Sequence, residues 1–121
     1  MRRWLVTALL GLLWVMRIAQ AQEYKPAFDL KAPAIVADGQ RLFNRSCAGQ
    51  CHGPDGQEGF NGPILIGKPY LDPSYVFVTL STGRPGSAMP PWTGRLPDDE
   101  LWKIIAYLSS LGDQARAAAA K

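Results

Sequence analysis

The sequence predicts an all-α domain of three to four helices joined by long loops rich in glycine and proline. Apolar residues recur at helical spacing over 34–46 and again over 97–111. Glycine and proline are frequent in the segments between these stretches, and none of those segments reads as a strand. Loops this long usually line or cover something in a compact domain.

Residues 1–21 have the features of a secretory signal peptide. Arginines at positions 2 and 3 precede an apolar run over 4–16, and small residues at 19 and 21 form a cleavage site. The run has 13 residues, whereas a membrane-spanning helix needs about 20. We therefore expect cleavage after Ala21, export to the periplasm and no stable membrane insertion. An uncleaved N-terminal anchor is the alternative.

Removal of this segment brings the net charge close to zero. Arg2, Arg3 and Arg17 are three of the 13 basic residues, which leaves ten against ten acidic residues. Nucleic-acid binding is therefore not expected, because it needs a basic stripe on the folded domain. Attraction of a partner by charge should also be weak.

The first helix is expected over 34–46. Ile35, Leu42 and Phe43 fall on one of its faces. Gly39 lies on the same face, and a glycine inside a helical pattern often marks a close approach by another segment.

Two further helices have clear start and stop signals. The helix over 73–81 begins after Asp72, a good N-cap residue, and Gly83 suits its left-handed C-terminal cap. The helix over 97–111 has the clearest apolar stripe, and we expect Gly112 to end it. Three acidic residues in its first turn are interpreted as helix capping rather than as catalytic carboxylates. The alanine-rich tail should fray or extend this helix.

One short motif brings together most of the chemically informative residues. Cys47, Cys51 and His52 resemble the C-x-x-C-H signature of covalent haem attachment, but with one additional residue between the cysteines. Three interpretations compete. Both cysteines could bond to haem, with Gly49 absorbing the extra residue at positive φ; or Ala48 could occupy the first-cysteine register, so that only Cys51 is bonded; or the cysteines could form a disulfide without haem. We expect the first.

Two residues could ligate the iron of such a haem. After residue 21, His52 is the only histidine and Met89 the only methionine. A His/Met axial pair raises the reduction potential of haem iron, and it leaves no open position for a substrate.

These residues, in this order, make the sequence similar to class I bacterial cytochromes c. The resemblance extends from about 34 to 111, and the rest of the chain would be an irregular lead-in over 22–33 and a tail over 113–121, flanking a cytochrome c domain over 34–112. The matching residues are Gly39, Phe43, Cys47, Cys51, His52, Gly62, Pro63, Met89, Pro90, Leu101, Trp102, Tyr107 and Leu108.

The resemblance implies a small cytochrome c fold around one covalently attached haem c. The first and last helices would cross, with Gly39 close to Trp102 and Tyr107. The carbonyl group of Pro63 would accept a hydrogen bond from the far nitrogen of His52 and so fix its ring.

The resemblance also assigns the site residues. Cys47, Cys51, His52, Pro63 and Met89 would bind the cofactor, and His52 and Met89 would be the metal ligands.

The expected function is that of a periplasmic monohaem c-type cytochrome, an electron carrier and not an enzyme. Its partners would be redox proteins. The donor would be a quinoprotein, another periplasmic dehydrogenase or a respiratory donor, and the acceptor a terminal oxidase or reductase. Lys68, Arg84 and Arg95 lie in loops that could flank the haem edge, but we interpret them as scattered solubilising charges.

A copper-binding protein is the alternative. It would use Cys47, Cys51, His52 and Met89, because soft thiolate and thioether ligands suit copper. Exported copper proteins with such ligands have alternating β-α or all-β patterns, which this sequence lacks. Haem binding is therefore the preferred hypothesis.

Overall fold

The computed structural model describes residues 25–69 and 71–121. This part of the chain contains the α-helices α2 (Pro33–Phe43), α3 (Pro73–Thr82) and α4 (Asp98–Ala119), the π-helix η2 (Asn44–His52) and the 3-10 turn η3 (Pro54–Gly56). It has no strand, only an isolated bridge between Thr93 and Leu96. The predicted all-α class is confirmed.

The segment before α2 is described only in part. The signal peptide predicted over 1–21 lies outside the described residues. Residues 25–32 lead into α2 without helix or strand. None of the helices within the described ranges is long and apolar enough to cross a membrane.

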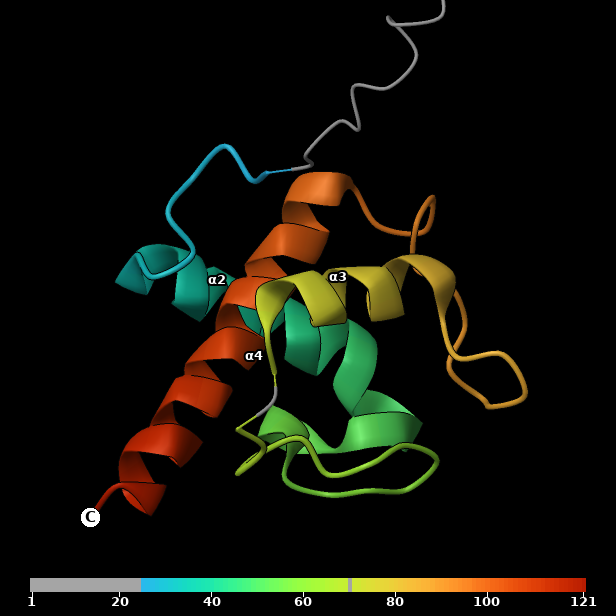
Figure 1. Ribbon diagram of the computed structural model, residues 1–121. Helices are drawn as coiled ribbons and strands as arrows, with labels where there is room; N and C mark the ends of the chain where they lie inside the picture. The colour runs from blue at the N-terminus through green and yellow to red at the C-terminus, as the bar shows by residue number, and fades with distance from the viewer. Residues whose placement is uncertain (1–24, 70) are drawn as a thin grey trace, which may run out of the picture.

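Helices α2 and α4 cross in close contact, with α3 packed beside the crossing (Figure 1). A Cβ placed on Gly39 of α2 would lie 1.9 Å from the carbonyl oxygen of Lys103 and 3.0 Å from Cβ of Tyr107, both in α4. The predicted close approach at Gly39 is therefore real, and the helices meet backbone to backbone. Trp102, which the resemblance also placed here, stacks on Phe77 of α3, with ring centroids 4.8 Å apart.

Helix α4 is the centre of the hydrophobic core. Leu101, Ile104 and Ile105 are fully buried, and Phe43 of α2 is buried against the same cluster. The apolar stripe predicted for the last helix thus faces the core. Burial of four large side chains is the main stabilising contribution here, at roughly 1.5–3 kcal/mol each.

Helix α3 has the predicted N-cap and ends at the predicted glycine. The carboxylate of Asp72 accepts hydrogen bonds from the backbone N–H groups of Ser74 (2.9 Å) and Tyr75 (3.3 Å). Gly83 follows the helix with φ 65° and ψ −162°; the positive φ favours glycine, but the conformation is not the left-handed cap that was predicted.

The predicted end of the last helix at Gly112 is wrong, and its extension by the alanine-rich tail is confirmed, because α4 continues to Ala119. Gly112 is packed so closely that a Cβ there would lie 3.3 Å from the carbonyl oxygen of Lys68. Beyond it, Arg116 donates a hydrogen bond to the carbonyl oxygen of Pro69, which ties the last turns to a loop. Alanine, the strongest helix former, fills the following positions. Tertiary packing and propensity therefore outweigh the single glycine.

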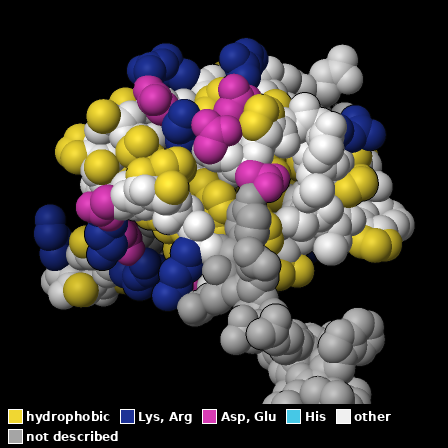
Figure 2. All heavy atoms as spheres, turned by 90° about the horizontal axis from the view of Figure 1, so that it is seen from above, with side chains coloured by type: hydrophobic (Ala, Val, Ile, Leu, Met, Phe, Trp, Pro, Cys, Tyr) yellow, Lys and Arg dark blue, Asp and Glu magenta, His cyan; other side chains and the backbone are white. Residues whose placement is uncertain are grey.

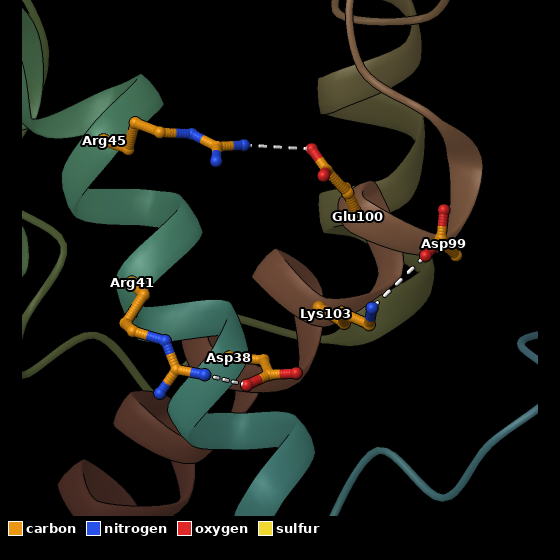
Figure 3. Close-up of polar contacts among 6 residues, drawn as sticks. All are labelled: Asp38, Arg41, Arg45, Asp99, Glu100 and Lys103. Atoms are coloured by element: carbon orange, nitrogen blue, oxygen red, sulfur yellow. Dashed lines mark hydrogen bonds and ion pairs between the residues drawn. The ribbon is translucent and has the colours of Figure 1, made fainter.

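Charged side chains contribute little to this fold. Arg45 of η2 pairs with Glu100 of α4 at 3.2 Å, and the pairs Arg41–Asp38 and Lys103–Asp99 lie within single helices (Figure 3). Exposed pairs of this kind contribute roughly 0–1 kcal/mol each. On the face shown in Figure 2, acidic side chains lie among basic ones.

Candidate haem site

A cavity lies between the π-helix, the loop that follows it, α3, the loop after α3 and α4. Its volume is about 190 Å³, and it opens to solvent. Its inner lining is apolar, and it includes Phe43, Leu65, Leu71, Val76, Leu80, Ile104 and Leu108.

All five sequence-predicted site residues line this one cavity. Cys47, Cys51 and His52 come from the π-helix, Pro63 from the next loop and Met89 from the loop after α3. Residues 42 positions apart in the chain therefore share one site. These residues fit a haem. Cys47 and Cys51 supply two sulfur atoms for attachment, His52 and Met89 supply two iron ligands, and the interior between them is apolar.

The π-helix shows how the extra residue of the attachment motif is accommodated. The N–H group of Gly53 donates a hydrogen bond to the carbonyl oxygen of Ala48, five residues back, at 2.9 Å. A π-helical turn holds one residue more than an α-helical hydrogen-bonded turn. The predicted irregularity does lie at Gly49, which is non-helical, but its φ is 6° and its ψ −115°. The extra residue is thus accommodated by this wider hydrogen-bonded turn together with a kink at Gly49, although the backbone of Gly49 is not in the left-handed region.

The two cysteines differ in their surroundings. Cys47 is buried, Cys51 is half-buried, and both are free thiols. Burial, with a smaller contribution from the neighbouring Cys51, raises the pKa of Cys47 to about 12. Cys47 therefore sits where a neutral sulfur is favoured, and a thioether is also neutral. Ala48 is buried as well but is not among the described residues that line the cavity.

His52 is buried, with its ring oriented by the backbone of the next loop. Its Nδ1 atom lies 2.8 Å from the carbonyl oxygen of Pro63, so the hydrogen bond that the resemblance implied is present. When Nδ1–H donates to this carbonyl, the lone pair of Nε2 is left free for a metal. Gly62 forms a cradle under the ring, since a Cβ there would lie 2.7 Å from Cε1 of His52.

Met89 is half-buried and is positioned by the end of α3. A Cβ on Gly83 would lie 2.7 Å from the carbonyl oxygen of Met89 and 2.6 Å from the carbonyl carbon of Pro90. The N–H group of Arg84 donates to that same Met89 oxygen at 3.1 Å. On its other side, the N–H group of Met89 donates to Oγ of Ser87 at 3.2 Å. The backbone of Met89 is therefore held at both its polar groups.

Sequence reasoning missed a polar cluster around Asp55. This residue has φ 54°, and its carboxylate accepts hydrogen bonds from Gln40 at 3.0 Å and Asn44 at 2.7 Å. The hydroxyl group of Tyr107 lies 3.4 Å from the same carboxylate. These hydrogen bonds lower the pKa of Asp55, and the bond from Gln40 contributes most. The pKa of Tyr107 is raised to about 12, mainly by burial and to a smaller extent by the negative charge of Asp55. The only sequence signal was Asp55-Gly56, which reads as an ordinary turn.

The arrangement of the thiols does not favour the copper alternative. Within the described residues, no three side chains of His, Cys, Asp or Glu are placed to hold one metal ion. Cys47, Cys51 and His52 are neighbours along the chain, but they do not converge on a point as the ligands of a copper site would.

Comparison with known proteins decides the family. The family described as "Cytochrome C oxidase, cbb3-type, subunit III" matches residues 34–108. The chain belongs to this family of class I cytochromes c. It is an electron-transfer haem protein whose cofactor is covalently attached haem c.

Two cytochromes of different kinds are similar in sequence to this chain. The cbb3-type cytochrome c oxidase subunit FixP of Rhizobium meliloti (strain 1021) is 32% identical over 85 residues, which are 66% of this chain and 29% of FixP. Cytochrome c6 of Diacronema lutheri is 30% identical over 81 residues, which are 62% of this chain and 94% of that protein. The chain thus spans less than a third of FixP but nearly all of cytochrome c6.

Solved structures support the cytochrome c fold. Cytochrome CL of the marine methylotrophic bacterium Methylophaga aminisulfidivorans MPT superposes with a TM-score of 0.61 at 22% identity, over 78% of this chain and 77% of that one. The reducing HAO-like protein complex of Kuenenia stuttgartiensis gives a TM-score of 0.54 at 24% identity, over 76% of this chain and 52% of that one.

Proposed function

We propose that this cytochrome is an exported, periplasmic monohaem electron carrier. Cys47 and Cys51 hold the haem through two thioether bonds, and His52 and Met89 are its axial ligands. One observation carries the proposal: these four side chains, from two distant segments, line the same apolar cavity. The position of Cys47 on the cavity, where Ala48 is absent from the lining, supports a bond from each cysteine.

The residues of the site suit electron transfer without substrate turnover. Haem supplies an iron that accepts and releases one electron. The hydrogen bond from Nδ1 of His52 to Pro63 fixes the imidazole, and the thioether of Met89 favours the reduced state. With both His52 and Met89 as ligands, the iron would offer no open position to a small substrate.

We further propose that its partners are redox proteins that dock near the attachment site. The donor is a quinoprotein, another periplasmic dehydrogenase or a respiratory donor, and the acceptor is a terminal oxidase or reductase. The likeness to FixP, a subunit of a cbb3-type oxidase, supports an oxidase as acceptor. Phe60, Ile64 and Ile66 are exposed on the loop after the π-helix, where the N–H group of Phe60 donates to the carbonyl oxygen of Cys51 at 3.1 Å.

The proposal is tested on protein produced in a host that matures c-type cytochromes. The expected results are a sharp Soret band, split visible bands on reduction and an intact mass that includes one haem. A pyridine haemochrome spectrum then counts the vinyl groups consumed, and two are expected. Cys47→Ala and Cys51→Ala should each give the spectrum of a single thioether. Colourless wild-type protein from such a host would contradict the proposed function.

A further inference from the structure

One rim of the haem cavity differs chemically from the rest of its lining. Tyr75, Arg84 and Ser87 line the same cavity as the apolar residues, and all three are exposed to solvent. Among the described lining residues, Arg84 is the one side chain with a permanent charge. Haem is itself divided in this way, with an apolar ring and two carboxylate groups, the propionates, on one edge.

Arg84 and Tyr75 form a pair at this rim. Nη2 of Arg84 donates a hydrogen bond to the Tyr75 hydroxyl at 2.5 Å, and Cζ of Arg84 lies 5.9 Å from the centre of the Tyr75 ring. A guanidinium group has five N–H donors, so others are left for a further acceptor. Because the Tyr75 oxygen accepts from Arg84, its own proton can be donated elsewhere. The pair therefore offers hydrogen-bond donors from both side chains to one anion.

Among the described residues, no carboxylate pairs with Arg84. Within residues 25–69 and 71–121, the ion pairs of the arginines involve Arg41, Arg45 and Arg116. Arg84 pairs with no acidic side chain in these ranges. An unpaired guanidinium beside an apolar cavity is well suited to a planar carboxylate, which it can bind with two parallel hydrogen bonds.

The backbone keeps Arg84 at a fixed place relative to Met89. In addition to the hydrogen bond from its N–H group to Met89, its carbonyl oxygen accepts from the N–H group of Ser87 at 3.0 Å and from the hydroxyl of Ser87 at 2.7 Å. Arg84 and Met89 are thus the two ends of one closed turn, and both border the cavity.

We propose that Arg84 and Tyr75 bind a haem propionate at this rim and compensate its negative charge. The proposal rests on the proposed haem site and names residues that position and tune the cofactor. An uncompensated carboxylate near the iron stabilises the ferric state, which carries one more positive charge than the ferrous state. Arg84 therefore raises the reduction potential, and its effect is larger at a cavity than in bulk water because screening there is weaker.

The test compares the reduction potential of the purified holoprotein with those of Arg84→Gln, Arg84→Lys and the control Arg95→Gln. Arg95 is an exposed loop residue outside the described cavity lining, so its loss changes the net charge equally. Arg84→Gln should lower the potential by an amount equivalent to at least a several-fold change in the redox equilibrium. Arg84→Lys keeps the positive charge, so its reduction potential should be close to that of the wild type. Arg95→Gln should leave the potential nearly unchanged.

Salt concentration separates a propionate contact from a general surface charge. The effect of Arg84→Gln should persist at about 1 M salt, where exposed charges are screened beyond about 3 Å. Equal shifts in Arg84→Gln and Arg95→Gln that disappear at high salt would overturn the proposal. So would an unchanged potential combined with slower electron transfer to a partner at low salt, because Arg84 would then act in docking.

Tyr75→Phe gives a second, independent measurement. It removes one donor to the propionate and should lower the potential in the same direction as Arg84→Gln, but by less. If Arg84→Gln does not accumulate as holoprotein, the test uses Tyr75→Phe and Arg84→Lys. A lowered potential in Tyr75→Phe together with a near wild-type potential in Arg84→Lys supports the proposal. An unchanged potential in Tyr75→Phe overturns it. Failure of the wild-type protein to carry haem would instead contradict the proposed function itself.

Discussion

The Nδ1 atom of His52 lies 2.8 Å from the carbonyl oxygen of Pro63, and the preceding residue, Gly62, packs against the same ring. A Cβ on Gly62 would lie 2.7 Å from Cε1 and 3.0 Å from Nδ1 of His52. One short stretch of backbone thus both holds the imidazole and excludes any side chain beneath it. The orientation of the proposed iron ligand is therefore set by this loop.

Gly62→Ala should disturb the ligand ring. Because the added methyl group cannot fit at 2.7 Å, the ring or the loop must shift, at a cost of about 1–3 kcal/mol, typical of overpacking. We expect a lower reduction potential and weaker protection of the haem from ligand exchange, measured by redox titration and by azide or cyanide binding. Gly67→Ala is the control, because its Cβ would meet nothing within 4 Å although its φ is +75°. If both variants behave alike, strain in the loop, and not contact with His52, sets the potential.

Met89→Ala should open one axial position. We expect the ferrous protein to bind carbon monoxide and the potential to fall, because the thioether that favours the reduced state is lost. Met89→Leu is the matched variant, since it preserves the volume and should change stability by less than about 1.5 kcal/mol. Both variants should bind carbon monoxide, as seen from the shift of the Soret band. Ready binding by the wild-type protein would argue against axial ligation by Met89.

Gly39→Ala should destabilise the fold. Alanine gains about 1 kcal/mol over glycine inside a helix, but a Cβ lying 1.9 Å from the Lys103 oxygen must push α2 and α4 apart. We expect a net loss of about 1–3 kcal/mol or more in the free energy of unfolding, measured by urea denaturation of the holoprotein. Ala37→Gly, at an exposed position of α2, measures how much the difference in helix propensity between alanine and glycine alone changes the free energy of unfolding. A Gly39→Ala protein more stable than the wild type would show that the crossing is looser than described.

Asp55→Asn should weaken the dependence of stability on acidic pH. The pKa of Asp55 is lowered in the folded state. Its stabilisation is therefore complete above the unfolded pKa of about 3.9 and is lost as the pH falls through the lower folded value. Asparagine tolerates the left-handed backbone at this position, so the turn should persist. The free energy of unfolding, measured against pH down to this range, should fall less steeply in Asp55→Asn than in the wild type. Asp29→Asn, at an exposed site, should retain the wild-type slope.

Features fixed by neighbouring residues were predictable from the sequence. Asp72 and Gly83 delimit α3 because capping depends on a few adjacent backbone groups. The apolar stripe of α4 needs only the helical period. The gathering of Cys47 and Met89 at one cavity could be anticipated only through the resemblance to class I cytochromes c.

Features that depend on distant contacts were not predictable in this way. Gly112 does not end α4, because Arg116 and the packing against Lys68 and Leu71 hold the following turns. The cluster around Asp55 joins residues up to 52 positions apart. Gly49 was the right place for an irregularity, but the wider hydrogen-bonded turn from Ala48 to Gly53 that accompanies its kink could not be read from the sequence.

The π-helix at Asn44–His52 bears on how such attachment motifs can vary. Successive residues of an α-helix are turned by about 100° around the axis, so one inserted residue would swing everything after it away from its former neighbours. Here a turn closed by the hydrogen bond from Gly53 to Ala48, one residue wider than an α-helical turn, and the kink at Gly49 lie within the segment itself. Lengthening the motif by one residue is thus a local event, and searches that require the shorter spacing between the cysteines would overlook proteins built like this one.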